Sequence, residues 1–198
     1  MANAFDELNQ KSIRHSIFAW NETNFIAGGT GGYQSSHLGL SEDGIAAIKE
    51  HEKHQWIIDV SHLNDHSFLV VVRITDMPLL ASHSNARRLC NHERNLTDEE
   101  LKAISYSGGL IGVNAYESFV DQNEPTIDRF IDHIIYIAEL VGIDHVGFGF
   151  DFVDYLQTYN LGSDMSNMTI GLEDATKIPD LIRRMSSCGF CHFLNRLQ

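Results

Sequence analysis

The sequence predicts an α/β fold built on a parallel β-sheet, and three observations support this prediction. Five short apolar runs alternate with amphipathic stretches along the 198 residues, an order typical of βα units with parallel strands. Polar residues stand directly after several apolar runs, as they do at the catalytic end of a (β/α)8 barrel. Hydrophobic residues make up 43% of the chain, which is enough for a substantial core. Five strands cannot close an eight-stranded barrel, so we expect a partial barrel forming one domain over residues 1–198.

The first half of the chain is divided by one clear helix start. Ser41 is followed by acidic residues and then by apolar residues, so it is predicted to cap a helix. The apolar run at 56–60 is typical of a buried strand. The expected elements are, in order, a helix at 3–12, a strand at 13–20, the helix after Ser41, a strand at 56–60, a helical stretch at 68–72 and a strand at 79–81.

The second half contains a capping box and a long amphipathic helix. Thr97 is followed three residues later by Glu100, which predicts a helix that continues to about residue 106. Apolar residues recur with helical spacing between 126 and 141. The expected elements are the capped helix, a strand at 110–114, a helix at 126–141, a strand at 145–150 and a last helix at 178–185.

Charge and composition exclude several classes of protein. The chain has 14 Lys+Arg against 27 Asp+Glu, a net charge of −13, so nucleic acid is an unfavourable partner. No apolar run is long enough to cross a bilayer, and the N-terminus lacks the pattern of a secretory signal. Three cysteines form no disulfide framework. These features predict a cytoplasmic location without a membrane span.

Two histidines follow neighbouring predicted strands. His62 comes after the run at 56–60 and His83 after the strand at 79–81, and a serine precedes each of them. Strand ends of a barrel point side chains into one mouth, where two neutral imidazoles suit a zinc ion. The alternative is that both are strand-end histidines bonded to nearby carbonyl groups.

Arg94 and Asp151 also lie at positions where a barrel carries its chemistry. Arg94 stands in the loop after the second histidine strand, where its guanidinium could clamp a carboxylate. The alternative is a surface arginine paired with Asp98 or Glu99. Asp151 follows the last predicted strand and could accept and pass on a proton, or it could be a loop or capping aspartate.

Four segments of the sequence, taken together, resemble those of one known protein family. The segments IIDVSHL, ASHSNARRLCNHERNLTDEELKAI, GGLIGVNAY and TIDRFIDHIIYIAELVGIDHVGFGFDF resemble the renal (membrane) dipeptidase family, peptidase family M19, in order and spacing from about residue 13 to 184. The resemblance implies a metal-dependent hydrolase of the (β/α)8 type with two zinc ions. Such an enzyme cleaves dipeptides with a metal-bound hydroxide, and this chain would cover about strands 4–8.

The resemblance also assigns roles to individual residues. His62 and His83 would be ligands of one zinc ion, Arg94 would bind the carboxylate of the substrate, and Asp151 would assist proton transfer. Trp20 stands where some family members carry a histidine that polarises the substrate, as in a bacterial branch. With Arg94 and the strand-end residue Asn114, Trp20 completes the expected substrate-binding set.

The sequence departs from the family in its metal ligands. The His-x-Asp motif and the glutamate that bridges the two zinc ions have no counterpart, so the N-terminal strands are expected to be missing. Catalytic zinc usually has three protein ligands, so we expect at most one weak zinc site and little or no activity of the chain alone. Exposed strand edges predict a homo-oligomer, or a partner that supplies the missing half.

Two rival functions remain open from the sequence. A non-catalytic domain could keep the fold for assembly. Another metal-dependent amidohydrolase would typically use a carboxylated lysine, and no lysine stands at a predicted strand end.

Three further motifs are not expected to carry chemistry. The Cys-x-x-Cys-His pattern at 188–192 is not expected to bind haem, because no export signal accompanies it. The glycine-rich segment 28–32 is predicted to form a flexible active-site rim. The histidines at 51 and 54 are predicted to lie at a solvated helix end.

Overall fold

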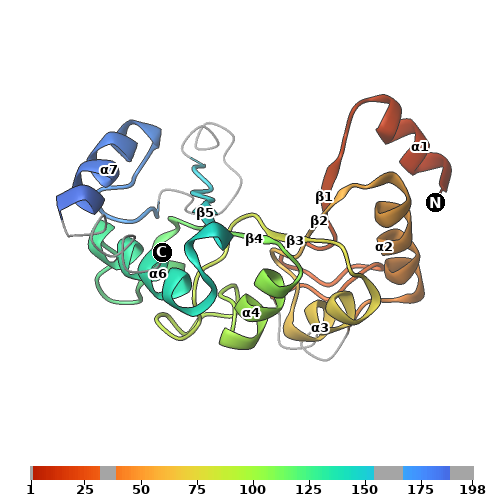
Figure 1. The fold of residues 1–198 in the computed structure, drawn as a ribbon, viewed down its shortest axis with the longest axis horizontal. Coiled ribbons are helices and arrows are strands. Elements are labelled where there is room, and N and C mark those ends of the chain that lie inside the picture. The colour runs from red at the N-terminus through yellow and green to blue at the C-terminus, as the bar shows by residue number, and fades with distance from the viewer. Residues whose placement is uncertain (1, 32–38, 154–166, 188–198) are drawn as a thin grey trace. The chain divides into compact units, whose positions relative to one another are not determined.

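A computed structural model describes residues 2–31, 39–153 and 167–187 (Figure 1). Its five strands form one sheet in the order β1-β2-β3-β4-β5. The pairs β1–β2, β2–β3 and β4–β5 are parallel, which confirms the predicted α/β class. The strands are β1 (His15–Ile17), β2 (Ile57–Asp59), β3 (Leu79–Ala81), β4 (Leu110–Val113) and β5 (Val146–Phe148).

Seven α-helices and two short 3-10 helices precede, connect or follow these strands within the described ranges. They are α1 (Ala2–Gln10), α2 (Glu42–His54), α3 (Asp65–Ile74), α4 (Asp98–Tyr106), α5 (Glu117–Val120), α6 (Ile127–Val141) and α7 (Ile178–Ser187), with 3-10 helices at Ile143–His145 and Ala175–Lys177. The chain divides into two compact units, residues 1–82 with 103–110 and residues 83–102 with 111–198. The boundary between the two units crosses α4 after residue 102 and crosses β4 after its first residue, Leu110.

Polar side chains start the helices as the sequence predicted, with one start that it missed. The Ser41 hydroxyl accepts from Gly44 N at 3.1 Å at the start of α2, and Thr97 and Glu100 bond reciprocally before α4. Asn64 Oδ1 accepts from Ser67 N at 2.8 Å, so α3 begins before the apolar run at 68–72. An N-cap amide replaces one missing intrahelical bond, which explains the earlier start.

In the first unit, α2 covers one face of β1 and β2. Ser16 lies opposite Ile58 in the parallel register, and its hydroxyl contacts His51 Nε2 at 2.9 Å. His51 is buried and packs against Phe5, with ring centroids 5.2 Å apart, and against Phe18 at 4.9 Å. The predicted solvated helix end is therefore wrong at His51, because this imidazole lies in the core.

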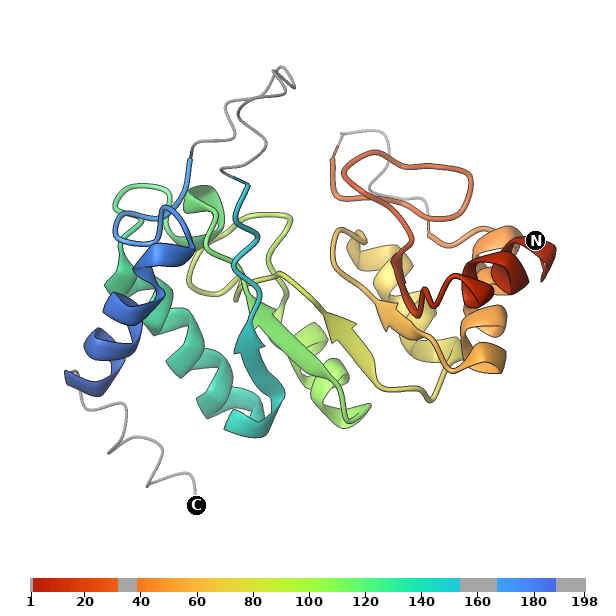
Figure 2. The ribbon, with the colours of Figure 1, turned by 90° about the horizontal axis from the view of Figure 1, so that it is seen from above.

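The second unit packs α6 against β5. Figure 2 shows β4 and β5 side by side, with α6 next to β5 and α7 beyond α6. Phe130 of α6 is buried and stacks on Phe150 at 5.7 Å. Strand β5 is shorter than the predicted 145–150: His145 belongs to the 3-10 turn that precedes it, and the strand ends at Phe148.

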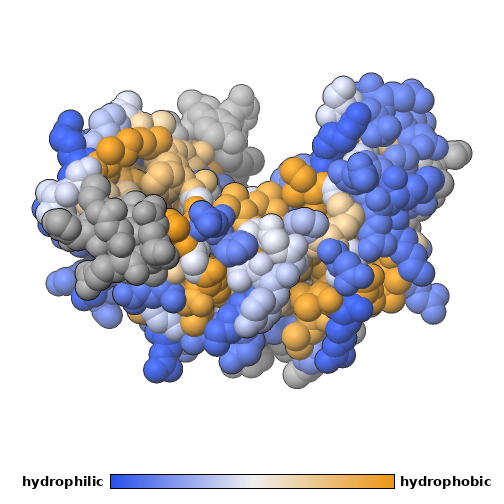
Figure 3. All heavy atoms as spheres, viewed as in Figure 1, coloured by the Kyte–Doolittle hydropathy of each residue, from blue (hydrophilic) through white to orange (hydrophobic). Residues whose placement is uncertain are grey.

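Apolar side chains also reach the surface of the second unit around α7 (Figure 3), where Ile182 is exposed. Along the described parts of the chain, every helix is too short or too polar to cross a membrane. The Cys-x-x-Cys-His pattern and Gly32 fall outside the residues that the structure describes.

Candidate functional site

His62 lies in a tight turn directly after β2. It adopts a left-handed backbone conformation with φ of 69°, which is uncommon for a residue with a side chain and often marks functional turns. Its side chain is buried, at 7% exposure. Nδ1 of His62 contacts Asn21 Oδ1 at 3.0 Å. An accepting amide oxygen selects the tautomer in which Nδ1 carries the proton, and Nε2 is then the nitrogen that suits a metal.

Trp20 lies beside this histidine in the first unit. The two ring centroids are 6.2 Å apart, and the indole is 59% exposed. The structure therefore brings together two of the predicted site residues, one expected to bind substrate and one expected to bind zinc.

The described part of the glycine-rich loop packs against the same turn. Thr30 N donates to His62 O at 3.1 Å, and Gly31 N donates to Asn21 O. A Cβ added at Gly29 would lie 2.5 Å from Asn21 O, so only glycine permits this close approach. Thr30 and Gly31, at the end of the described part of this loop, are thus hydrogen-bonded to His62 and Asn21.

Arg94 is buried in the second unit, at 6% exposure. Its Nη2 donates to His83 O at 3.3 Å, and its guanidinium carbon lies 5.4 Å from the centre of the Phe119 ring. The alternative of an arginine exposed at the surface is therefore wrong. Two predicted site residues, Arg94 and His83, are neighbours through this hydrogen bond.

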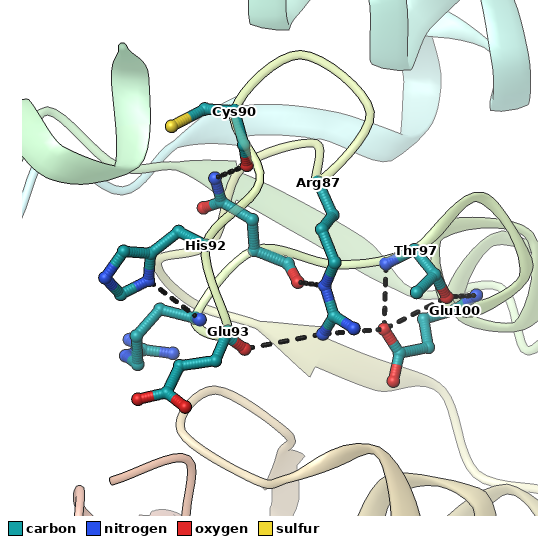
Figure 4. A network of polar contacts seen from close by, with 8 residues as sticks. Arg87, Cys90, His92, Glu93, Thr97 and Glu100 are labelled. Carbon is teal, nitrogen blue, oxygen red and sulfur yellow. Dashed lines mark hydrogen bonds and ion pairs between the residues drawn. The ribbon is translucent and has the colours of Figure 1, made fainter. Parts of the chain in front are cut away.

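A polar network braces the loop that carries Arg94 (Figure 4). Arg87 Nε donates to Asn95 O at 2.7 Å, and Arg87 Nη2 lies 3.8 Å from Glu100 Oε2. The same carboxylate oxygen accepts from Thr97 N at 2.8 Å. His92 Nδ1 accepts from Arg94 N at 3.1 Å. Burial, and then the charges of Arg94 and Arg87, lower the pKa of His92, in agreement with a neutral ring that accepts this bond.

Asn114 and Asp151 meet at the ends of β4 and β5. Asn114 is fully buried, and its Nδ2 donates to Asp151 Oδ2 at 3.4 Å. Asp151 has a positive φ of 58°, which an aspartate tolerates better than most residues. Asn85 holds Asn114 from the other side, since its Oδ1 accepts from Asn114 N at 2.7 Å.

Sequence reasoning missed the residues that orient the predicted site residues. Asn21 contacts the imidazole of His62, and Asn85 binds both the N–H and the carbonyl group of Asn114. Asn21 directly follows Trp20, and Asn85 stands two residues after His83. This closeness in sequence to predicted site residues is the signal that could have indicated them. Their partners lie 41 and 29 residues away, which no local pattern shows.

The donor set fits a zinc ion only in part. The tautomer of His62 suits a zinc ligand, and His83 is the second histidine that the sequence predicts as a ligand. His62 belongs to the first unit and His83 begins the second. Among residues 2–31, 39–153 and 167–187, no three His, Cys, Asp or Glu side chains form a group that could hold a metal.

Comparisons with known proteins agree on one family. The family model for membrane dipeptidases, peptidase family M19, matches residues 2–191. An uncharacterised dipeptidase of Schizosaccharomyces pombe is 36% identical over 147 residues, which cover 73% of this chain and 33% of the relative. A Klebsiella pneumoniae protein from the pqqA 5′ region is 35% identical over 183 residues, covering 86% of this chain and 62% of the relative.

Solved structures show the same relationship. A Rhodobacter sphaeroides metallopeptidase, solved with a phosphinate mimic of the dipeptide L-Ala-D-Ala, superposes with a TM-score of 0.81 at 26% identity, over 100% of this chain and 60% of that one. A dipeptidase AC of family M19 superposes with a TM-score of 0.81 at 28% identity, over 95% and 54%. The chain spans less than two thirds of the length of each of these relatives. With a family model matched over residues 2–191, the chain belongs to the membrane dipeptidase family, peptidase family M19.

Proposed function

We propose that this chain is the part of a zinc-dependent dipeptidase that binds the substrate carboxylate and transfers the proton, on a partial (β/α)8 barrel. The observation that carries the proposal is the burial of Arg94 beside the backbone of His83. Family membership supplies the reaction class, hydrolysis of a dipeptide amide bond.

Arg94 is proposed to bind the C-terminal carboxylate of the dipeptide. A planar guanidinium offers five N–H donors in a fixed fork that matches a carboxylate. Contact with the Phe119 ring and the His83 carbonyl fixes the plane of this group. Because Arg94 is buried, its attraction for a carboxylate is screened less than that of a surface arginine.

Asp151 is proposed to move the proton during hydrolysis. The attacking water forms a bond from its oxygen to the carbonyl carbon, and Asp151 accepts its proton. The C–N bond then breaks, and Asp151 delivers the proton to the leaving amine. Asn114 Nδ2 orients the Asp151 carboxylate through the 3.4 Å contact.

His62 and His83 are proposed to bind zinc, as the family signature implies. When bound, zinc would polarise the scissile carbonyl and lower the pKa of the attacking water. The Asn21 oxygen fixes the ring of His62 for this role, and Trp20 forms a wall beside it.

This chain is proposed to hold at most one weak zinc site and to have little or no activity alone. A stable catalytic zinc site needs about three protein ligands. The part of the chain that the structure describes offers no such cluster.

The test is zinc content per chain together with hydrolysis of a small dipeptide panel. Variants are His62→Ala and Arg94→Lys, with controls at the exposed His66→Ala and Arg88→Lys. Weak zinc binding that is lost in His62→Ala and kept in His66→Ala would support the metal proposal. Zinc-dependent turnover that is abolished by His62→Ala would show that a second copy or another segment completes the site. The proposal that the chain has little activity alone would then be wrong. If turnover occurs, Arg94→Lys should raise KM for free dipeptides but not for C-terminally amidated ones.

A second candidate function is non-catalytic assembly. Among the strands that the structure describes, β1 stands at one edge of the sheet, and Ile17 and Ile57 on neighbouring strands are exposed. Exposed apolar residues beside an unpaired strand edge favour association. Light scattering at several concentrations tests this candidate, and a monomer with zinc-dependent turnover would exclude it.

A further inference from the structure

Asp59 is a fully buried carboxylate at the last position of β2. Its Oδ1 accepts from Ser61 N at 2.9 Å and from Ser82 N at 3.2 Å. Its Oδ2 contacts His15 Nε2 at 2.8 Å. Every one of these contacts lies within the first unit.

The two amides bound by Asp59 belong to the residues that stand directly before the two candidate zinc-binding histidines. Ser61 directly precedes His62, and Ser82 directly precedes His83. We propose that Asp59 is the positioning residue for both candidate zinc-binding histidines, because one carboxylate oxygen fixes the backbone that enters each of their turns. This inference rests on the proposed zinc-binding role of His62 and His83.

The chemistry of the site favours an ionised carboxylate. Burial alone would raise the pKa of Asp59, but hydrogen bonds from the Ser82 hydroxyl, the Ser61 amide and His15 outweigh burial and lower it. Hydrogen bonds to a charged acceptor are shorter and stronger than neutral ones. The hydroxyl oxygens of Ser61 and Ser82 lie 3.3 Å apart, so a further hydrogen bond joins the same two turns.

The position of Asp59 in the parallel register explains how one residue reaches both turns. Asp59 pairs with Ile17 on β1 and with Leu80 on β3. Ser82 is two residues after Leu80, so side chains at 59 and 82 share one face of the sheet. The polar residue of the opposite face, Ser16, contacts His51 instead.

Four variants of the full chain separate positioning from charge. Asp59→Ala removes the acceptor, whereas Asp59→Asn keeps an Oδ1 acceptor without the charge. Asp59→Glu keeps the charge but displaces the carboxylate by one methylene group. Ser16→Ala is the matched control, since it deletes one part-buried hydrogen bond on the opposite face of the same strands.

The first readout is Co²⁺ titration of the full chain, followed by visible absorption and calorimetry, with His62→Ala and His83→Ala as references. Loss of an orienting partner typically weakens metal binding about 10–100-fold, and we expect this for Asp59→Ala and Asp59→Glu. Asp59→Asn should lose less Co²⁺ affinity than Asp59→Ala, because it keeps a weaker, neutral acceptor for the two serine amides. Ser16→Ala should bind Co²⁺ nearly as tightly as the unchanged chain. Equal losses in Asp59→Asn and Asp59→Ala would show that only charge matters and would overturn the positioning role.

The second readout needs no metal. Hydrogen exchange followed by NMR should show that Ser61 and Ser82 amides lose protection in Asp59→Ala, while the Ile58 amide in β2 keeps it. If the unchanged chain binds no Co²⁺ through His62 and His83, the proposed function fails, and hydrogen exchange alone decides the role of Asp59. Retained protection of both serine amides in Asp59→Ala refutes it. If Asp59→Ala does not fold, Asp59→Glu decides, and unchanged Co²⁺ affinity there refutes the inference.

Discussion

Protonation of His133 is expected to destabilise the second unit, and the geometry of this histidine fixes the sign. His133 of α6 is 1% exposed. Its Nδ1 accepts from Ala86 N at 3.1 Å, so Nε2 must carry the proton and donate to Val120 O at 2.9 Å. A second proton would replace the Ala86 hydrogen bond with a repulsive contact between two donors.

Burial lowers the pKa of His133, although the bond to Val120 O and the charges of Asp132 and Asp121 oppose it. Below the ordinary pKa of 6.5, the unfolded chain therefore binds a proton that the folded chain does not. Stability from this histidine is complete above pH 6.5 and is lost as the pH falls from 6.5 towards the lowered folded pKa. The slope for one proton reaches at most about 1.4 kcal/mol per pH unit.

The variant His133→Leu tests this reasoning. It leaves the Ala86 amide and the Val120 carbonyl without their partner, so the free energy of unfolding should fall by about 2–4 kcal/mol at pH 7.5. Between pH 7 and 5 its stability should fall less steeply than that of the unchanged chain, because one titrating group is gone.

Urea unfolding followed by circular dichroism at half-unit pH steps measures both quantities. His51 and His92, whose pKa values are also lowered mainly by burial, contribute equally to both proteins and cancel in the difference. Parallel stability curves for the two proteins over pH 7 to 5 would refute the account.

Three further substitutions test the local structure by thermal or urea unfolding. Glu100→Ala removes the capping box before α4 and the contact with Arg87, and should lower the free energy of unfolding by about 1–2 kcal/mol. Gly29→Ala should lower it by about 1–3 kcal/mol, because the new Cβ would lie 2.5 Å from Asn21 O; an unchanged stability would mean that the loop does not pack on Asn21. Arg184→Ala deletes an exposed ion pair with Asp128 and should change stability by less than about 1 kcal/mol, so a larger loss would show that this pair is not simply a surface contact.

Local signals in the sequence determined most of the secondary structure. Ser41 and Thr97 each bind an amide three residues ahead, so their helix starts can be read from a few residues. Strand β3 has the bounds predicted from its apolar run. Helix α3 begins earlier than the apolar run at 68–72 predicts, because its cap, Asn64, is followed by three polar residues that show no apolar pattern.

The sequence also determined the family and the residues on which the candidate site depends, because motifs such as SHSNAR keep their order and spacing. It could not determine how those residues are held. Asp59 is joined to Ser82, 23 residues away, and His62 to Asn21, 41 residues away. Arg94 is buried, and its guanidinium lies over the ring of Phe119, which comes from a different element. Such contacts arise only when the strand order brings distant segments together, since hydrogen bonds and packing act over a few ångströms in space and not along the chain.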